Sequence, residues 1–224
     1  SGGLHGVGVS VTNALSKRLE VTVQREGQTA SIVFSHGDVI QPVQVQPGAP
    51  RKQGTKVRVW PEAKYFDAPE LPRGELVHLL RSKAVLMPGV TVTLTDEKKG
   101  ETQTWLYKGG LREYLQGSLN AEPVVELFEG AHYAKASDTE NFAEGEGAAW
   151  CVAFTEEAAS QRESYVNLIP TVAGGTHEAG LKDGLFQAVK TFIELHSLLP
   201  KGVKLMPEDL FGRASFVLSA KVLD

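Results

Sequence analysis

The 224-residue sequence has a single cysteine, a small deficit of basic residues and no apolar run of the about 18 residues that a membrane helix needs. One thiol cannot form an internal disulfide, so we expect a cytoplasmic protein. The lack of a long apolar run predicts that the protein has no membrane partner. Cys151 lies in the apolar stretch AAWCVAF, which predicts a buried side chain rather than a nucleophile. The formal net charge of -4 excludes nucleic-acid binding by bulk charge, although it permits a local basic face.

Glycine is concentrated at the start of the chain, in GLHGVG at positions 3–8, directly before a segment at 10–17 with helical periodicity. Glycines allow close approach of the backbone, and a helix N-terminus offers unpaired N–H groups and a positive dipole end. The pattern therefore favours a phosphate-binding loop, with a purely structural turn as an equal alternative on pattern alone. Because the sequence opens inside this motif, with Ser1-Gly2 and no initiator Met, we expect a fragment of a longer protein.

Alternating polar and apolar residues predict a series of strands in the first part of the chain. The first two flank the turn Glu26-Gly27 as a hairpin, and the third contains Pro42, which favours an edge position. We expect the strands at 19–25, 28–34, 39–46 and 54–61, followed by a helix at 76–86 and a second hairpin around the turn at 98–100. This order predicts an α+β fold: an α/β sandwich with one mixed, mostly antiparallel sheet and helices on one face.

A change in composition after Tyr107 predicts a boundary between domains at 1–108 and 109–224. In the second domain we expect strands at 124–133, 147–155, 164–171 and 213–222, with helices at 176–197 and 207–211. The order strand, helix, strand predicts a crossover connection, and Thr176 is the expected N-cap of the long helix. His177 and Glu178 lack further ligands at metal-binding spacing, so they predict a helix start rather than a metal site.

Three segments in this order resemble one enzyme family. The first 27 residues resemble the nucleotide lid and following helix of the GHKL ATPases, among them the B subunits of bacterial type II DNA topoisomerases. GTKVRVWP at 54–61 resembles the family's GT-x-V-x-F-x-P segment, and YVNLIPTVAGGTHEAGL at 165–181 resembles its transducer domain, with YVNLIPT more similar to topoisomerase IV than to gyrase. The resemblance implies the C-terminal part of a GHKL ATPase sandwich followed by a truncated transducer domain of ribosomal-protein-like β-α-β fold.

The resemblance also implies roles for particular residues. Those expected around the ATP triphosphate are Gly3, Leu4, His5, Gly6, Val7, Gly8 and Val9. Gly54 and Thr55 match the strand end that meets the adenine, and Arg25 matches an arginine at the mouth of the pocket, where aminocoumarin inhibitors bind. From the residues alone, a hairpin charge is the favoured explanation of Arg25, and an ordinary β-branched strand residue is that of Thr55.

The family's catalytic glutamate, magnesium-binding asparagine and adenine-reading aspartate are expected upstream of the lid, and its γ-phosphate lysine downstream of Asp224. We therefore expect ATP and Mg²⁺ as cofactors of the longer protein, with no catalytic residue or metal ligand in this chain and no ATPase activity of the chain alone.

The resemblance implies three partners: DNA, the topoisomerase A subunit, and a second copy of the B subunit. Four basic residues are candidates for facing DNA, although a solvated surface explains them as well: Lys182, Lys190, Arg213 and Lys221. The alternatives are the gyrase B subunit, another GHKL member such as a mismatch-repair protein or heat-shock chaperone, or, in a different class, a non-catalytic dimerisation or nucleic-acid-interaction module.

Overall fold

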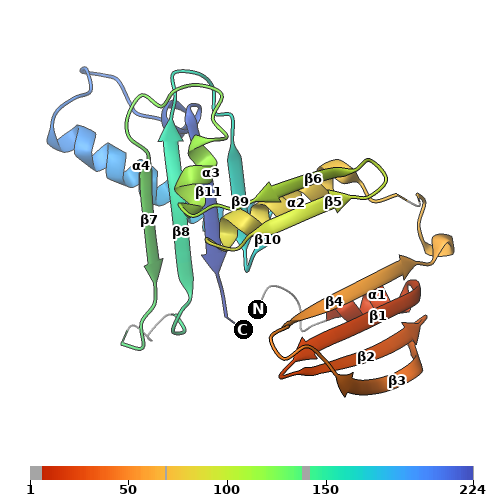
Figure 1. Cartoon of the computed structure of the whole chain (residues 1–224). Coiled ribbons are helices and arrows are strands. Elements are labelled where there is room, and N and C mark those ends of the chain that lie inside the picture. The colour runs from red at the N-terminus through yellow and green to blue at the C-terminus, as the bar shows by residue number, and fades with distance from the viewer. Residues whose placement is uncertain (1–6, 69, 138–141, 224) are drawn as a thin grey trace. The chain divides into compact units, whose positions relative to one another are not determined.

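The computed structural model describes residues 7–68, 70–137 and 142–223, and the chain divides into two compact units, residues 3–73 and residues 74–224. We call them the N-terminal unit and the C-terminal unit. Both combine helices with mainly antiparallel sheets, as an α+β fold requires (Figure 1). The predicted domain boundary after residue 108 stays a prediction.

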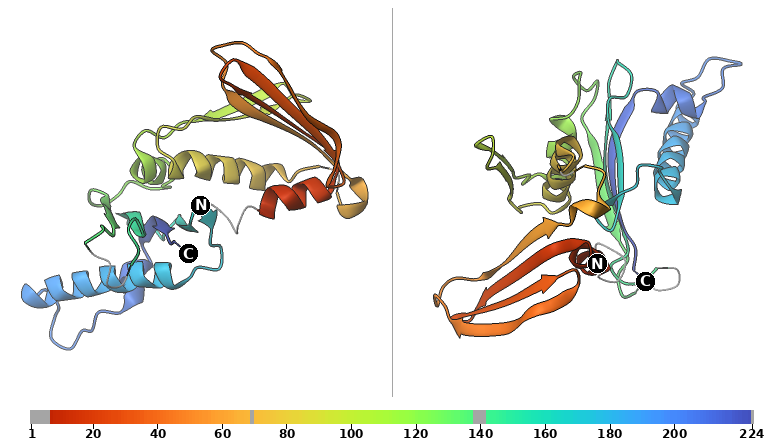
Figure 2. Two further views of the ribbon diagram at one scale, coloured as in Figure 1. Left: turned by 90° about the horizontal axis from the view of Figure 1, so that it is seen from below. Right: turned by 90° about the vertical axis from the view of Figure 1, so that its right-hand side faces the viewer.

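The N-terminal unit is a four-stranded antiparallel sheet in the order β3-β2-β1-β4, with one helix, α1, packed against β1 and β2 (Figure 2). The elements are α1 (Val7–Ala14), β1 (Ser16–Arg25), β2 (Gln28–Ser35), β3 (Asp38–Pro47), β4 (Gly54–Pro61) and a 3-10 turn at Ala63–Tyr65. Leu19 and Val33 are its buried apolar side chains. The helix expected at 10–17 already includes Val7 and ends three residues earlier than expected, at Ala14, because Ser16 pairs with Pro61 in the sheet.

Turn chemistry explains the order of these strands. Glu26 and Gly27 join β1 to β2 with φ values of 53° and 72°, the left-handed pair that fits a two-residue hairpin. β3 lies at the edge of the sheet, as Pro42 predicts. Its register with β2 shifts between Gln44 and Gln41, so the proline lies in an irregular stretch of the ladder.

The C-terminal unit contains a five-stranded sheet in the order β10-β9-β11-β8-β7. Its strands are β7 (Phe128–Tyr133), β8 (Gly147–Phe154), β9 (Arg162–Val166), β10 (Ile169–Pro170) and β11 (Ala214–Lys221). β9 and β11 are parallel and all other pairs are antiparallel. The crossover between β9 and β11 runs through α4 (Thr176–Leu195) and α5 (Pro207–Phe211), which confirms the predicted strand-helix-strand unit.

Helices lie on both faces of this sheet (Figure 2). On one face, Cys151 of β8 and Val217 of β11 pack with side chains of α2 (Arg73–Leu86) and α3 (Gly110–Gln116). On the other face, Val152, Phe216 and Leu218 pack with Leu181 and Leu185 of α4. Neighbouring residues of one strand therefore enter different cores, as the two-residue period of a strand requires. None of the twenty residues of α4, all of which the structure describes, is buried, so the packing of this helix leaves each of its side chains partly exposed.

Two details differ from the expectation. The second hairpin, β5 (Val92–Asp96) and β6 (Glu101–Trp105), forms a two-stranded sheet of its own instead of extending the first sheet. The segment at 164–171 is a hairpin rather than one strand, because Asn167 and Leu168 both take positive φ and reverse the chain between β9 and β10.

Candidate functional site

The glycine-rich motif leads directly into α1. Gly3, Leu4, His5 and Gly6 lie outside the described residues, whereas Val7, Gly8 and Val9 are the first described residues of the helix and are exposed. The N–H groups of a first turn have no partner within the helix and sit at its positive end. A Cβ placed on Gly8 would meet no heavy atom within 4 Å, so the backbone here borders open space. This arrangement suits an anion.

Side-chain hydrogen bonds brace α1 along its length. The Thr12 hydroxyl donates to the carbonyl of Gly8 at 2.9 Å, and the Ser16 hydroxyl donates to the carbonyl of Thr12 at 2.5 Å. At its end, the N–H of Glu62 donates to the carbonyl of Leu15 at 3.0 Å, which ties the segment after β4 to the end of the helix. The first turn is therefore carried by a helix that is fixed at its other end.

Gly54, Thr55 and Arg25 come together at one end of the sheet. Gly54 pairs with Gln24 and Thr55 with Val23, beside Arg25 at the end of β1. Gly54 has a φ of 149°, a backbone conformation that favours glycine. A Cβ added to it would have no neighbour within 4 Å, so the strand end is open. The exposed guanidinium of Arg25 contacts the carboxylate of Glu26 at 2.9 Å. This group lies at the far end of β1 from its junction with α1, about 30 Å along the strand.

The four basic residues expected to face DNA do not share one element or one end of an element. Lys182 and Lys190 lie on α4 and are paired with Glu178 at 2.6 Å and Glu194 at 3.9 Å. Arg213 and Lys221 flank β11 at its two ends, about 26 Å apart by strand rise. Their role in DNA binding stays a prediction, and the ion pairs on α4 reduce the positive charge that two of them offer.

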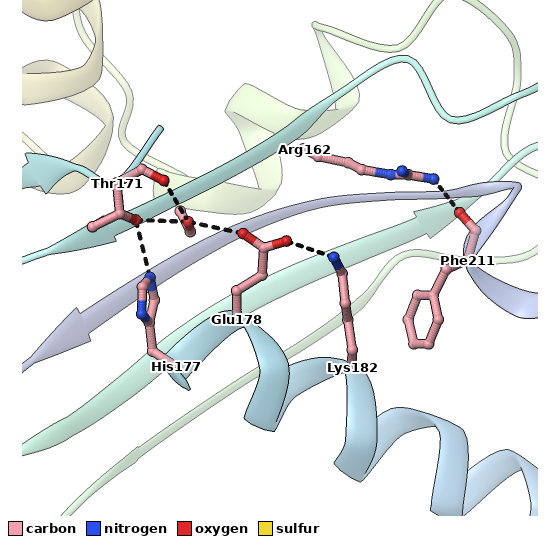
Figure 3. A network of polar contacts seen from close by, with 7 residues as sticks. Arg162, Thr171, His177, Glu178, Lys182 and Phe211 are labelled. Carbon is pink, nitrogen blue, oxygen red and sulfur yellow. Dashed lines mark hydrogen bonds and ion pairs between the residues drawn. The ribbon is translucent and has the colours of Figure 1, made fainter. Parts of the chain in front are cut away.

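A network of polar contacts surrounds the start of α4 (Figure 3). The Thr171 hydroxyl contacts His177 Nε2 at 3.0 Å and the Ser164 hydroxyl at 2.7 Å, and Ser164 also donates to Glu178 at 3.2 Å. The hydrogen bond from Lys182 lowers the pKa of Glu178, while burial opposes that shift. His177 and Glu178 thus fasten the first turn of the helix to the β9–β10 hairpin.

The expected N-cap is wrong by one residue. Gly175 is the N-cap, without a side-chain capping bond, and Thr176 is the first helical residue. A Cβ at Gly175 would lie 2.8 Å from the ring of His177, so a larger residue here would displace that ring.

A second network, which sequence reasoning missed, centres on Glu163 of β9. Its carboxylate accepts hydrogen bonds from the hydroxyl groups of Tyr114 at 2.9 Å and Tyr165 at 2.5 Å, and from the amide of Gln161. Both tyrosines are buried, and burial together with the charge of Glu163 raises the pKa of each. The guanidinium of Arg81 lies over the Tyr114 ring at 4.9 Å. No sequence signal links Tyr114 to a carboxylate 49 positions away.

Cys151 is fully buried, as predicted, and burial raises the pKa of its thiol to about 11. Among residues 7–68, 70–137 and 142–223, no group of three or more His, Cys, Asp or Glu side chains is placed to hold a metal ion. The magnesium prediction therefore remains untested. No helix in the described part of the chain is long and apolar enough to cross a membrane.

Comparison with known proteins gives the family. The family model described as DNA gyrase B matches residues 110–224, more than half of the chain. The chain belongs to the DNA gyrase B family. The B subunit of DNA topoisomerase 4 from Salmonella typhimurium is 44% identical over 227 residues, and the DNA gyrase B subunit of Helicobacter pylori is 32% identical over 227 residues. The matches include 100% and 99% of this chain, but 35% and 28% of those proteins. The chain thus spans about a third of their length.

Solved structures of the DNA gyrase B family share the fold. The topoisomerase IV ATP-binding domain of Francisella tularensis, solved with a small-molecule inhibitor, matches with a TM-score of 0.75 at 36% identity, over 100% of this chain and 60% of that one. The 43K ATPase domain of Thermus thermophilus gyrase B, solved with an aminocoumarin, gives a TM-score of 0.79 at 28% identity, over 98% and 59%. The predicted fold class and the resemblance to topoisomerase B subunits are confirmed.

Proposed function

We propose that this chain is part of the B subunit of a bacterial type II DNA topoisomerase of the topoisomerase IV kind, which uses ATP to drive strand passage. The higher identity to the topoisomerase 4 protein than to the gyrase protein supports this choice. We assign residues 1–108 to the end of the ATPase domain and 109–224 to the transducer domain. The match of the family model to 110–224 supports the second assignment.

The exposure of Val7, Gly8 and Val9 at the described start of α1 is the observation on which the proposal rests. A triphosphate is an anion, and the unpaired amides that follow a glycine-rich loop are suited to bind one. In this proposal residues 3–9 surround the phosphates, Gly54 and Thr55 approach the adenine, and Arg25 lies at the pocket mouth. The printed descriptions of the structural relatives, an ATP-binding domain and an ATPase domain, support nucleotide binding.

The remaining parts of the proposal concern the longer protein. Magnesium, the catalytic base and the adenine-reading acid come from residues outside this chain, so this polypeptide alone does not hydrolyse ATP. DNA, the A subunit and a second B subunit are its partners, and the cytoplasm is its location. Lys182, Lys190, Arg213 and Lys221 remain the candidates for contact with DNA.

Gly8→Ala tests the phosphate role in the longer protein. Gly8 is the second residue of α1, and a Cβ there meets nothing within 4 Å, so alanine leaves the fold intact and favours the helix. A methyl group beside the binding amides obstructs the phosphate, and we expect affinity for a nonhydrolysable ATP analogue to fall at least about tenfold, or about 1.4 kcal/mol.

Gly74→Ala is the matched control. Gly74 is likewise the second residue of a helix, α2, and likewise has no neighbour within 4 Å of an added Cβ. It should bind the analogue as the wild type does. Isothermal titration calorimetry measures both affinities. Equal binding by the Gly8 and Gly74 variants would remove the phosphate role of α1, and magnesium-dependent ATP turnover by the isolated chain would contradict the assignment of catalysis elsewhere.

A further inference from the structure

The two-residue turn between β9 and β10 has an unusual backbone. Asn167 and Leu168 have φ values of 49° and 66°, in the left-handed region that asparagine tolerates and leucine disfavours. A leucine stays in this region only where surrounding contacts determine its conformation. The contacts of the turn therefore indicate what it is fixed to.

Asn167 holds the chain as it leaves β11. Its side-chain N–H donates to the carbonyl of Val222 at 2.9 Å, and its side-chain oxygen accepts the N–H of Val222 at 3.0 Å. Its own backbone N–H donates to the carbonyl of Ala220 at 2.9 Å. The carboxylate of Glu146 holds the next residue, because it accepts a hydrogen bond from the N–H of Leu223 at 2.7 Å. Side chains from two separate segments thus set the course of residues 222–223.

Leu168 holds α2 on the other side of the turn. Its carbonyl accepts a hydrogen bond from the ammonium group of Lys83, a residue 85 positions earlier in sequence. Lys83 lies next to Ala84 and Val85, which are both buried, and Val85 packs in the core between α2 and the sheet. Lys83 is therefore carried on a packed helix and is not a freely moving surface side chain.

We propose that Asn167 and Lys83 are positioning residues that couple α2 to the segment leaving β11. The two anchored residues are adjacent, so the turn contains no flexible residue between the bond to α2 and the bonds to Val222. A shift of α2 moves the Leu168 carbonyl, and only the backbone dihedrals of Leu168 and Asn167 lie between that carbonyl and the Asn167 side chain. The coupling goes beyond the proposed function and does not depend on nucleotide binding, since every contact lies within the C-terminal unit.

Amide hydrogen exchange at Val222, followed by NMR on the 224-residue chain, tests this coupling. Asn167→Gly removes the side-chain bonds and keeps a residue that accepts positive φ, so we expect exchange at Val222 to accelerate at least about tenfold. Lys83→Met retains the apolar stem and removes the donor. Although Lys83 does not contact Val222, we expect this variant to accelerate exchange there at least about threefold, and Lys83→Arg to restore the wild-type rate.

Two comparisons make the result specific. Arg112→Met is the matched control, because Arg112 also donates to a backbone carbonyl, that of Leu127 at 3.3 Å, and it should leave Val222 unchanged. Val217, in the middle of β11, reports global opening, and its exchange should accelerate less than that of Val222 in every variant. In the Asn167→Gly background, Lys83→Met should have no further effect on Val222. Wild-type exchange at Val222 in Lys83→Met, or equal acceleration at Val222 and Val217, would overturn the proposal.

Discussion

The two buried tyrosines that donate to Glu163 make the C-terminal unit sensitive to alkali. Because the pKa of Tyr114 and of Tyr165 is raised in the folded state, both rings stay protonated at a pH where they ionise in the unfolded chain, above their ordinary value of 10.0. The unfolded state then binds fewer protons, so stability falls as the pH rises above about 10. Linkage gives a loss of about 1.4 kcal/mol per ring at pH 11, or about 2.8 kcal/mol for the pair.

The double variant Tyr114→Phe, Tyr165→Phe isolates this effect. At neutral pH it loses two hydrogen bonds to a charged acceptor, each contributing about 1.5–3 kcal/mol, so it should be less stable than the wild type. Since phenylalanine does not titrate, the difference in free energy of unfolding should shrink by about 2.8 kcal/mol between pH 8 and pH 11.

Urea denaturation of wild type and variant at a series of pH values measures that difference. Tyr133→Phe, which removes a phenol that is 42% exposed on β7, is the control and should follow the wild type. A difference between wild type and double variant that stays constant up to pH 11 would show that the two hydroxyl groups ionise alike in folded and unfolded chains, and would refute the reasoning.

Three further predictions concern the cores and the ion pair on α4. Leu19→Ala should lower the free energy of unfolding of the N-terminal unit, measured by denaturant titration, by about 2–5 kcal/mol, because the side chain is 1% exposed. Val57→Ala, at a site that is 52% exposed, should lower it by less than about 1 kcal/mol. Cys151 should resist a thiol reagent in the folded chain and react on unfolding, since it is buried with its pKa raised to about 11; rapid labelling without denaturant would contradict this. The pKa of Glu178 is lowered from its ordinary value of 4.5, so its interaction with Lys182 stabilises the fold above pH 4.5 and is lost as the pH falls through the lowered pKa. Glu178→Gln should therefore reduce the acid dependence of unfolding measured by circular dichroism. An unchanged pH profile would count against the ion pair.

Local chemistry explains which parts of the fold the sequence predicts. Glu26-Gly27 marks a hairpin because glycine accepts positive φ, Pro42 marks an edge because it lacks an N–H, and the long apolar face of α4 marks the crossover. Each of these signals lies within a few residues of the structure it specifies. The early end of α1 at Ala14 has a different origin, since the pairing of Ser16 with Pro61 depends on a strand 45 positions away.

The turn at Asn167-Leu168 shows why other features escape prediction. It contains neither glycine nor proline, and the apolar residues on both sides read as one continuous strand. Its reversal depends on distant contacts, with Val222 on one side and Lys83 on the other. The same reason applies to the site: the motif predicts an anion-binding helix start, whereas only the register of β1 and β4 reveals that Gly54 and Arg25 lie at one strand end.

The partial exposure of the side chains of α4 implies graded stability along this helix. Its first turns are fastened by His177, Glu178 and Leu181, but further along Phe192 is 57% exposed and Leu195 is 77% exposed. Few apolar contacts oppose fraying at that end, so the last turns should melt at a much smaller free-energy cost than the sheet does. The first turns of α4 are therefore more stable than its last turns, and a ligand that covers the last turns would order them without rearranging the strands.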